Sequence, residues 1–270
     1  MKSLINHIIS ELRDFYPEEE LRELALWIIE EATGMTRTQI ITATSAAEIP
    51  NLNAIIEQLR THKPIQHIFE HTLWMGLDLR VTSDTLIPRP ETAELVEWII
   101  KKCDQSTPLR VADIGTGSGC IAIALKQHCP IWQVCGFDIS EKALNIARIN
   151  AKNNALPVDF YQLDILTKSI ENQDIVVSNP PYICHREKAD MTPRVLDHEP
   201  HTALFVPDND PLLFYRRIAS LKAGKNLFFE INEAYGQEVC EMMAELGYTD
   251  IQLKHDIYGK ARMVFGRIEA

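Results

Sequence analysis

The chain has 270 residues, of which 46% are hydrophobic, so it holds enough apolar material for one large domain or two modest ones. Lysine and arginine number 27 against 38 aspartates and glutamates, a net charge of −11, which disfavours nucleic-acid phosphates and suits a basic protein or a small molecule better. The cysteines form no CxxC pair, the start does not resemble a signal peptide, and no stretch approaches the ~20 apolar residues of a membrane span, so we expect a cytoplasmic protein.

The first seventy residues are dominated by helical periodicity. Apolar residues recur with the spacing of an amphipathic helix in three stretches, which are 4–15, 21–29 and 53–59. Pro17 and the glutamates after it suit the first turn of a helix, Gly34 suits its end, and Ser45-Ala46-Ala47-Glu48 fits a capping box. Residues 1–70 are therefore predicted to form a small helical domain, which serves either as a packing module or for substrate recognition.

Residues 71–90 differ in character from what precedes them. Apolar residues mixed with Gly76 predict a short β-hairpin, and Ile87-Pro88-Arg89-Pro90 is stiff because each proline fixes its own φ angle. We therefore assign 71–90 to a hairpin linker between two domains, followed by a helix over 93–101.

From residue 109 onward, strand-like and helical patterns alternate. The strand-like runs are 109–114, 132–138, 158–163, 173–178 and 225–231, and the helical ones are 118–128, 140–153, 211–222 and 235–246. Such alternation predicts a parallel sheet covered on both faces. Two last strand-like runs, 249–256 and 261–267, flank a turn at Tyr258-Gly259 and predict an antiparallel hairpin. Residues 91–270 thus form a predicted α/β domain.

A glycine-rich turn follows the first of these strands. In Gly115-Thr116-Gly117-Ser118-Gly119 the glycines permit a tight turn and close approach to a ligand, and the amides of the next helix attract polar groups. The spacing GxGxG differs from the GxGxxG/A of dinucleotide sites, and there is no phosphate-loop lysine. This pattern favours S-adenosylmethionine, while a dinucleotide or simple helix–strand packing stays open.

Two aspartates stand at the ends of the next strands. Asp138 lies about twenty residues beyond the glycines, where a carboxylate can accept from both hydroxyls of a ribose. Asp164 either accepts from an adenine amino group or caps a helix before Ile165.

The most informative stretch is Asn179-Pro180-Pro181-Tyr182, which follows an apolar run. Prolines cannot continue a central strand, so these residues stand at the carboxyl edge of the sheet, the edge that also carries the glycine turn. They form either a rigid strand exit, with Tyr182 as an aromatic residue of the core, or a holder for the substrate beside the cofactor. Their pairing with the glycine turn favours the holder.

These residue types suit methyl transfer to a planar NH2 group, whose lone pair is delocalised. The Asn179 side-chain oxygen can accept from one N–H, and the Pro180 carbonyl can accept from the other. This hold favours a pyramidal nitrogen with its lone pair aimed at the methyl group, and such alignment is worth up to about 7–11 kcal/mol. The Tyr182 ring can stack on the flat group and exclude water. No acid/base pair is required.

Taken together, these residues resemble the peptide chain release factor glutamine methyltransferases over nearly the whole chain. The matching stretches are 64–68, 85–92, 113–119, 138–140, 178–183, 199–204, 214–217, 229–231 and 256–262. The tetrad 179–182 alone is shared with DNA adenine methyltransferases. The linker motif Arg89-Pro90-Glu91-Thr92 makes the resemblance specific.

The resemblance implies a class I, Rossmann-like methyltransferase sheet of seven strands behind the helical domain. It implies S-adenosylmethionine as cofactor, S-adenosylhomocysteine as product, and as substrate the side-chain amide nitrogen, N5, of the glutamine in the Gly-Gly-Gln loop of class I release factors. The residues expected to hold the cofactor are Gly115, Thr116, Gly117, Ser118, Gly119, Asp138, Asp164, Ile165 and Asn179. Those expected to hold the glutamine are Asn179, Pro180, Pro181 and Tyr182, with residues 88–92 lining the site.

The sequence departs from the family pattern in three places. Glu70 and Asn232 stand where glycine is usual, and residues 205–210 replace a glycine-rich stretch. These departures leave the proposed chemistry intact and bear on the shape of local loops.

Two other functions compete with this one. A DNA adenine-N6 methyltransferase would need a basic, aromatic-rich recognition region, against which the net charge argues. A non-catalytic binding protein could keep the fold, but it would not need Asn179 or the glycine turn. A metal site is not expected, because His198-Glu199-Pro200-His201 lacks the HExxH spacing and contains a proline.

Overall fold

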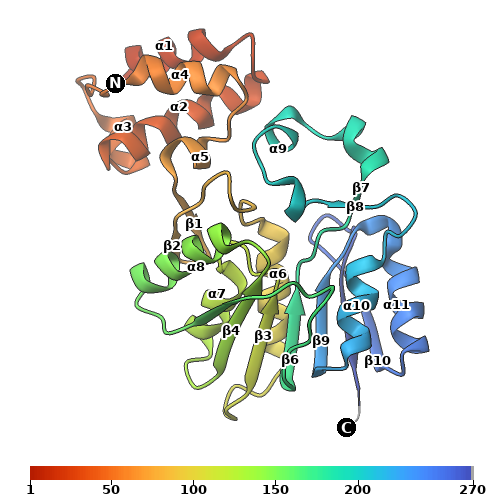
Figure 1. The fold of residues 1–270 in the computed structure, drawn as a ribbon. Helices are drawn as coiled ribbons and strands as arrows, with labels where there is room; N and C mark the ends of the chain where they lie inside the picture. The colour runs from red at the N-terminus through yellow and green to blue at the C-terminus, as the bar shows by residue number, and fades with distance from the viewer. Residues whose placement is uncertain (269–270) are drawn as a thin grey trace. The chain divides into compact units, whose positions relative to one another are not determined.

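The computed structural model describes residues 1–268. Their internal contacts divide the chain into two compact units, which are described separately (Figure 1). The first unit comprises Met1–His71 and Thr192–His198, and the second comprises Thr72–Met191 and the chain from Glu199 onward. Among the described residues, no helix combines the length and the apolar character that a membrane span requires.

The first unit is a bundle of short helices. They are α1 (Lys2–Leu12), α2 (Glu18–Thr33), α3 (Arg37–Thr42), α4 (Leu52–Arg60) and α5 (Ile65–Phe69), with α9 (Pro193–Leu196) from the later segment. The apolar stripes predicted for α1, α2 and α4 form its buried core. Helix α2 begins after Pro17 and ends at Gly34, whose φ of 67° is the left-handed conformation that favours glycine.

The capping box predicted at Ser45 is wrong. Helix α4 starts only at Leu52, because Pro50 disfavours a helical conformation at the residue before it. A capping box instead joins Thr36 and Gln39 at the start of α3.

The second unit opens with the predicted hairpin. Strands β1 (Thr72–Trp74) and β2 (Leu77–Leu79) pair antiparallel around Met75 and Gly76, whose φ angles are 49° and 76°. Two positive φ angles in a two-residue loop match the twist of a hairpin. The buried Asn150 side chain accepts from the Arg80 N–H at 2.7 Å, which holds the end of the hairpin on a later helix.

A seven-stranded sheet forms the centre of this unit, in the spatial order β10-β11-β9-β6-β3-β4-β5. The strands are β3 (Arg110–Ile114), β4 (Gln133–Asp138), β5 (Asp159–Gln162), β6 (Gln173–Ser178), β9 (Gly224–Glu230), β10 (Thr249–His255) and β11 (Ala261–Arg267). Neighbours pair in parallel, except that β11 is antiparallel to both β9 and β10. The predicted α/β sheet with an antiparallel C-terminal hairpin is confirmed.

Helices cover both faces of this sheet (Figure 1). On one face α6 (Pro90–Lys102), α7 (Cys120–His128) and α8 (Glu141–Asn153) share a buried cluster, and on the other α10 (Leu213–Leu221) and α11 (Gly236–Glu245) share a second. Successive strand residues enter opposite clusters, as Val176 and Val177 do. Burial on both faces explains why these strands are continuous apolar runs in the sequence.

Between β6 and α10 lies a segment without regular periodicity. Strand β7 (Ile183–Cys184) pairs in parallel with β8 (Phe205–Val206), and between them lie the short helices η1 (His185–Asp190), α9 and η2 (His201–Ala203). A further short helix, η3 (Glu233–Tyr235), precedes α11. Elements of this length carry no usable sequence pattern.

Candidate active site

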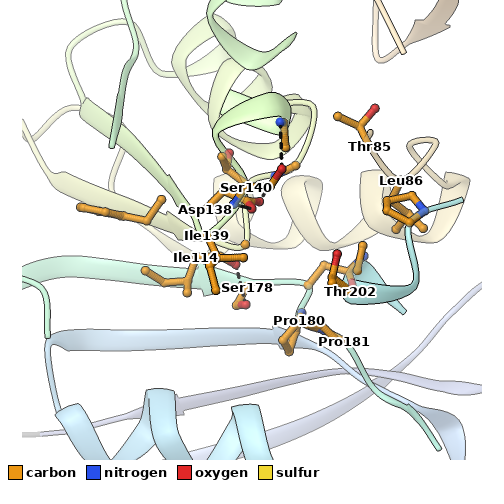
Figure 2. A pocket seen from close by; sticks show the side chains of 18 of the residues that line it. Thr85, Leu86, Ile114, Asp138, Ile139, Ser140, Ser178, Pro180, Pro181 and Thr202 are labelled. Atoms are coloured by element: carbon orange, nitrogen blue, oxygen red, sulfur yellow. Dashed lines mark hydrogen bonds between the residues drawn. The ribbon is translucent and has the colours of Figure 1, made fainter. Parts of the chain in front are cut away.

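A cavity of about 350 Å³ opens at the carboxyl ends of β3, β4 and β6 (Figure 2). After β3 the chain continues to β4 and β5 on one side, whereas β6 and β9 lie on the other, and ligands of α/β sheets bind at such a switch point. The predicted site residues that line it are Gly115, Thr116, Gly117, Ser118, Asp138, Asp164, Ile165, Asn179, Pro180 and Pro181.

The glycine turn is shaped by backbone conformations that favour glycine. Gly115, Gly117 and Gly119 have φ angles of 72°, 55° and 81°. A Cβ atom on Gly117 would meet nothing within 4 Å, so this residue faces open space. A Cβ atom on Gly119 would lie 3.0 Å from Ala147 and 3.1 Å from Phe160. Gly117 therefore leaves room for a ligand, whereas Gly119 allows close packing of α7.

Asp138 ties the end of β4 to the glycine turn. One of its carboxylate oxygens accepts from the Gly117 N–H at 2.9 Å, and the other accepts from the Ser140 N–H at 2.9 Å. Burial raises the pKa of Asp138, and these backbone hydrogen bonds oppose the rise. Each oxygen keeps a second lone pair, with which it can accept from a ligand hydroxyl.

Asp164 closes a turn at the rim of the cavity. Its carboxylate accepts from the Leu166 N–H at 3.0 Å and from the Thr167 hydroxyl at 3.1 Å, and the residues after it form a turn instead of a helix. Ile139 and Leu166, which also line the cavity, are 57% and 38% exposed. Apolar side chains left exposed there form a surface for a flat apolar ring.

The corner after β6 is held by side chains from other elements. Asn179 Nδ2 donates to Thr92 Oγ1 at 3.4 Å, and Asn232 Nδ2 donates to the Tyr182 carbonyl at 3.2 Å. The Tyr182 hydroxyl donates to Glu230 Oε1 at 3.4 Å. Its ring, which was predicted to stack on the substrate, packs against the buried cluster that α10 and α11 share and does not line the cavity. Asn232, which replaces a glycine of the family pattern, thus helps to fix the backbone of the corner.

Glu199 received no role from the sequence, yet it fixes part of the cavity wall. Its buried carboxylate accepts from Arg89 Nη2 at 2.5 Å and from the Ile87 N–H at 3.4 Å. Burial raises the pKa of Glu199, and the Arg89 guanidinium opposes the rise. The pair joins the segment before α6 to the start of the segment that carries Thr202 and Phe205, and both segments line the cavity.

Glu230 was also missed. It is 1% exposed, accepts from the Thr92 hydroxyl at 2.6 Å, and has a pKa that burial raises to about 7. An acidic residue inside the otherwise apolar run 227–231 was the signal that could have found it, because a buried carboxylate must have partners.

The other two departures from the family pattern also have visible consequences. Glu70 has a φ of 51°, a left-handed conformation that glycine adopts with less strain. Phe205 lines the cavity and stacks on His185, with 5.4 Å between the ring centroids. The cavity wall therefore carries an aromatic side chain where the family pattern has glycines.

Comparison with known proteins identifies the family of this chain. The model for the Methyltransferase small domain matches residues 92–202, and that for the PrmC N-terminal domain matches residues 3–69. The Release factor glutamine methyltransferase of Bacteroides thetaiotaomicron is 42% identical over 98% of this chain and 99% of its own, and that of Flavobacterium psychrophilum is 40% identical over 98% of both. This chain belongs to the release factor glutamine methyltransferase family. It is an S-adenosylmethionine-dependent methyltransferase.

The fold agrees with that assignment. Among solved structures, the catalytic domain of hMettl16 superposes with a TM-score of 0.59 at 19% identity, covering 73% of this chain and 77% of that one. The predicted class I methyltransferase fold is confirmed.

The cavity of this methyltransferase fits its cofactor. S-Adenosylmethionine needs room beside a tight turn, an acceptor for its ribose and an apolar surface for its adenine. The open side of Gly117, the carboxylate of Asp138 and the exposed Ile139 and Leu166 meet these needs within one hollow. The residues that line the cavity are thus chemically suited to bind S-adenosylmethionine.

Proposed function

We propose that this enzyme methylates the side-chain amide nitrogen, N5, of the glutamine in the Gly-Gly-Gln loop of class I peptide chain release factors, in the cytoplasm. The observation that carries the proposal is the place of Asn179, Pro180 and Pro181, which line the same cavity as the glycine turn. An acceptor pair for an NH2 group would therefore share one cavity with the cofactor. The names of relatives that match the chain along its whole length support the same substrate.

The cofactor is assigned to the side of the cavity formed by β3, β4 and the turn after β5. The assigned residues are Gly115, Thr116, Gly117, Ser118, Gly119, Asp138, Asp164 and Ile165, with Asn179 at the methyl end. Asp138 would accept from the ribose hydroxyls, and Asp164 would hold the adenine end. When bound, the cofactor supplies an electrophilic methyl group.

The corner after β6 binds and orients the substrate amide. Asn179 Oδ1 and the Pro180 carbonyl accept the two N–H groups of the substrate amide, which is poorly nucleophilic while its lone pair is delocalised. Pro181 keeps the corner rigid, and Tyr182 supports it through its contact with Glu230. The substrate nitrogen would bond to the methyl carbon while the bond from that carbon to the cofactor sulfur breaks, with its electron pair left on sulfur as S-adenosylhomocysteine forms. The nitrogen would keep one hydrogen and release the other as a proton to solvent.

The domain assignment belongs to the same proposal. We assign residues 1–70 to recognition of the release factor, 71–90 to a hairpin linker and 91–270 to catalysis. The separate match of residues 3–69 to an N-terminal domain model supports the first part of this division.

The test is transfer of tritium from labelled cofactor to purified substrates, measured side by side. We expect label in a whole release factor, none in its variant with the loop Gln replaced by Ala, and none in duplex DNA. A short peptide with the Gly-Gly-Gln sequence should be a poorer substrate than the whole factor, because it lacks the surface that residues 1–70 recognise. Label in DNA but in no release factor would contradict the proposal.

A further inference from the structure

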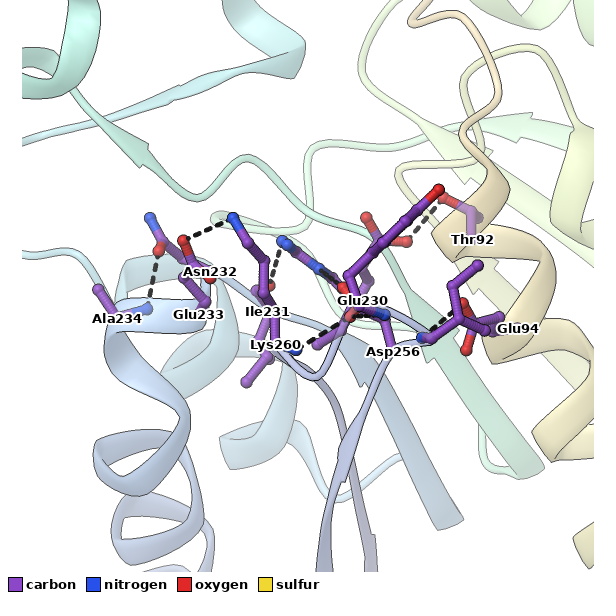
Figure 3. Close-up of polar contacts among 12 residues, drawn as sticks. Thr92, Glu94, Glu230, Ile231, Asn232, Glu233, Ala234, Asp256 and Lys260 are labelled. Carbon is purple, nitrogen blue, oxygen red and sulfur yellow. Dashed lines mark hydrogen bonds and ion pairs between the residues drawn. The ribbon is translucent and has the colours of Figure 1, made fainter. Parts of the chain in front are cut away.

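A hydrogen-bond chain runs from the wall of the cavity into the core of the second unit. Asn179 Nδ2 donates to Thr92 Oγ1 at 3.4 Å. The Thr92 hydroxyl donates to Glu230 Oε2 at 2.6 Å, and Figure 3 labels these two residues. Thr92, in the first turn of α6, is 2% exposed, and Glu230, the last residue of β9, is 1% exposed. Two buried side chains therefore link Asn179, which follows β6, to α6 and to the end of β9.

The direction of these hydrogen bonds is decided at Thr92. A hydroxyl has one proton to donate, and an ionised carboxylate can only accept. While Glu230 is ionised, it takes the Thr92 proton, so Thr92 can offer Asn179 only a lone pair. The Asn179 amide must then turn its NH2 towards Thr92 and its oxygen, Oδ1, to the opposite side.

We propose that Thr92 and Glu230 are positioning residues that hold the Asn179 amide with its oxygen towards the cavity, as an acceptor for a substrate N–H. Asn179 lines the cavity, whereas Glu230 acts through Thr92. The inference rests on the proposed function, because only a substrate that presents an NH2 group needs an acceptor there. If the Asn179 amide were turned the other way, its NH2 would face the NH2 of the substrate. Both groups are donors, so the substrate N–H would have no acceptor.

Several charged or titratable groups surround Glu230. Burial raises its pKa to about 7, while the hydrogen bond from Thr92 and the positive charge of Arg262 oppose the rise. The titratable groups that face it are Glu91 of α6, Cys120 of α7, Tyr182 after β6, Tyr215 of α10 and Arg262 of β11. Arg262 is shared with Asp256, to which its Nε donates at 3.2 Å, so it neutralises Glu230 only in part.

Protonation of Glu230 reverses the direction of the hydrogen bonds between Glu230, Thr92 and Asn179. The neutral carboxyl can donate to Thr92, whose own proton is then free to bind Asn179 Oδ1. The amide turns its NH2 to the cavity, where it opposes the NH2 of the substrate. The rate of methyl transfer, which needs the Asn179 oxygen turned to the cavity, should therefore fall as the pH falls through about 7.

Thr92→Val and Thr92→Ser form a matched pair, because valine removes the hydroxyl at similar size and serine keeps it. The measurements are the single-turnover rate of methyl transfer to a purified release factor, between about pH 5.5 and pH 8.5, and cofactor binding by calorimetry. Above neutral pH we expect Thr92→Val to be on the order of tenfold slower than wild type, because the Asn179 amide loses its fixed orientation. Thr92→Ser should stay near wild type, and both should bind cofactor as wild type does.

The deciding measurement is how the ratio of the wild-type rate to the Thr92→Val rate changes with pH. The ratio should shrink towards one below about pH 6, because protonated Glu230 already misdirects the wild-type amide. A ratio that does not change with pH, or a Thr92→Ser variant as slow as Thr92→Val, overturns the inference. Glu230→Gln is the second variant. Its side chain does not titrate in this range, so its rate should not follow the wild-type fall with pH, and a wild-type pH profile in it also overturns the inference. A wild-type enzyme that labels no release factor overturns the proposed function itself.

Discussion

Asn179 is the residue at which the buried strand β6, the cavity and the hydrogen-bond chain from Glu230 meet. Ser178 before it is anchored by a hydrogen bond from its hydroxyl to the Ile114 carbonyl at 2.7 Å, so the strand end beneath Asn179 is fixed to β3. Pro180 after it has no N–H and a restricted φ. The Asn179 side chain is therefore the adjustable part of a corner whose backbone is held on both sides.

Replacing Asn179 by alanine should slow methyl transfer far more than it weakens cofactor binding. Loss of one acceptor that acts in the transition state costs about 10²–10³ in rate. Asn179→Asp is the matched variant, because it keeps an acceptor but loses the NH2 that binds Thr92, and its loss should be smaller. Single-turnover rates and calorimetric cofactor affinities separate the two effects. Equal loss of rate and affinity in Asn179→Ala would assign the residue a structural role instead.

The residues of the site differ in how far the sequence could predict them. The glycine turn and the corner at Asn179 are local motifs, whose spacing and place after a strand can be read without the fold. The partnership of Thr92 and Glu230 spans 138 residues, and it exists only because α6 packs beside the end of β9. No local pattern encodes such a pair, and Glu199 with Arg89, 110 residues apart, was missed for the same reason.

At the scale of elements, length and two-sided burial decided what could be predicted. Helix α8 (predicted 140–153) and strand β11 (predicted 261–267) match their observed bounds, Glu141–Asn153 and Ala261–Arg267, closely. Strands β7 and β8 have two residues each and form by pairing with each other, so no periodicity announces them. The segment around them lines part of the cavity, and its shape could not be derived from the sequence.

The end of helix α10 offers a test at this scale. Lys222 caps the helix with φ 50° and ψ 29°, a left-handed conformation in which a Cβ atom is strained. Lys222→Gly should therefore raise the free energy of unfolding by about 1 kcal/mol, whereas Ser220→Gly, inside the same helix, should lower it by about 0.5–1 kcal/mol. Hydrogen exchange of the α10 amides measures both. A loss of protection in Lys222→Gly would show that the lysine side chain matters more than its backbone strain.

Over the whole molecule, carboxylates outnumber cations, and the structure buries several of them near the cavity, Asp113 and Glu230 among them. Asp113, at 0% exposure, accepts from the Thr116 hydroxyl at 2.6 Å and stands beneath the glycine turn, while Glu230 stands behind the substrate corner. Burial raises the pKa of Asp113 to about 7, and the Thr116 hydrogen bond only partly opposes the rise. The arrangement that shapes the site thus lowers the stability of the fold when both groups are ionised.

The stability of the second unit should therefore fall as the pH rises from about 4 to about 7. In this window the folded chain keeps protons on Asp113 and Glu230 that the unfolded chain has released, so each group contributes stability below its unfolded pKa and loses it as the pH rises through about 7. The slope is at most about 1.4 kcal/mol per pH unit for each group. Asp104, Asp250 and Asp256, whose pKa values are lowered, act in the opposite sense at more acid pH.

Hydrogen exchange of the β3 and β6 amides, corrected for intrinsic rates, measures the dependence of stability on pH in the second unit alone. In Asp113→Asn the slope of the unfolding free energy against pH should be smaller, because only Glu230 still contributes to it. An unchanged slope in that variant would mean that Asp113 is already ionised in the folded protein at pH 5.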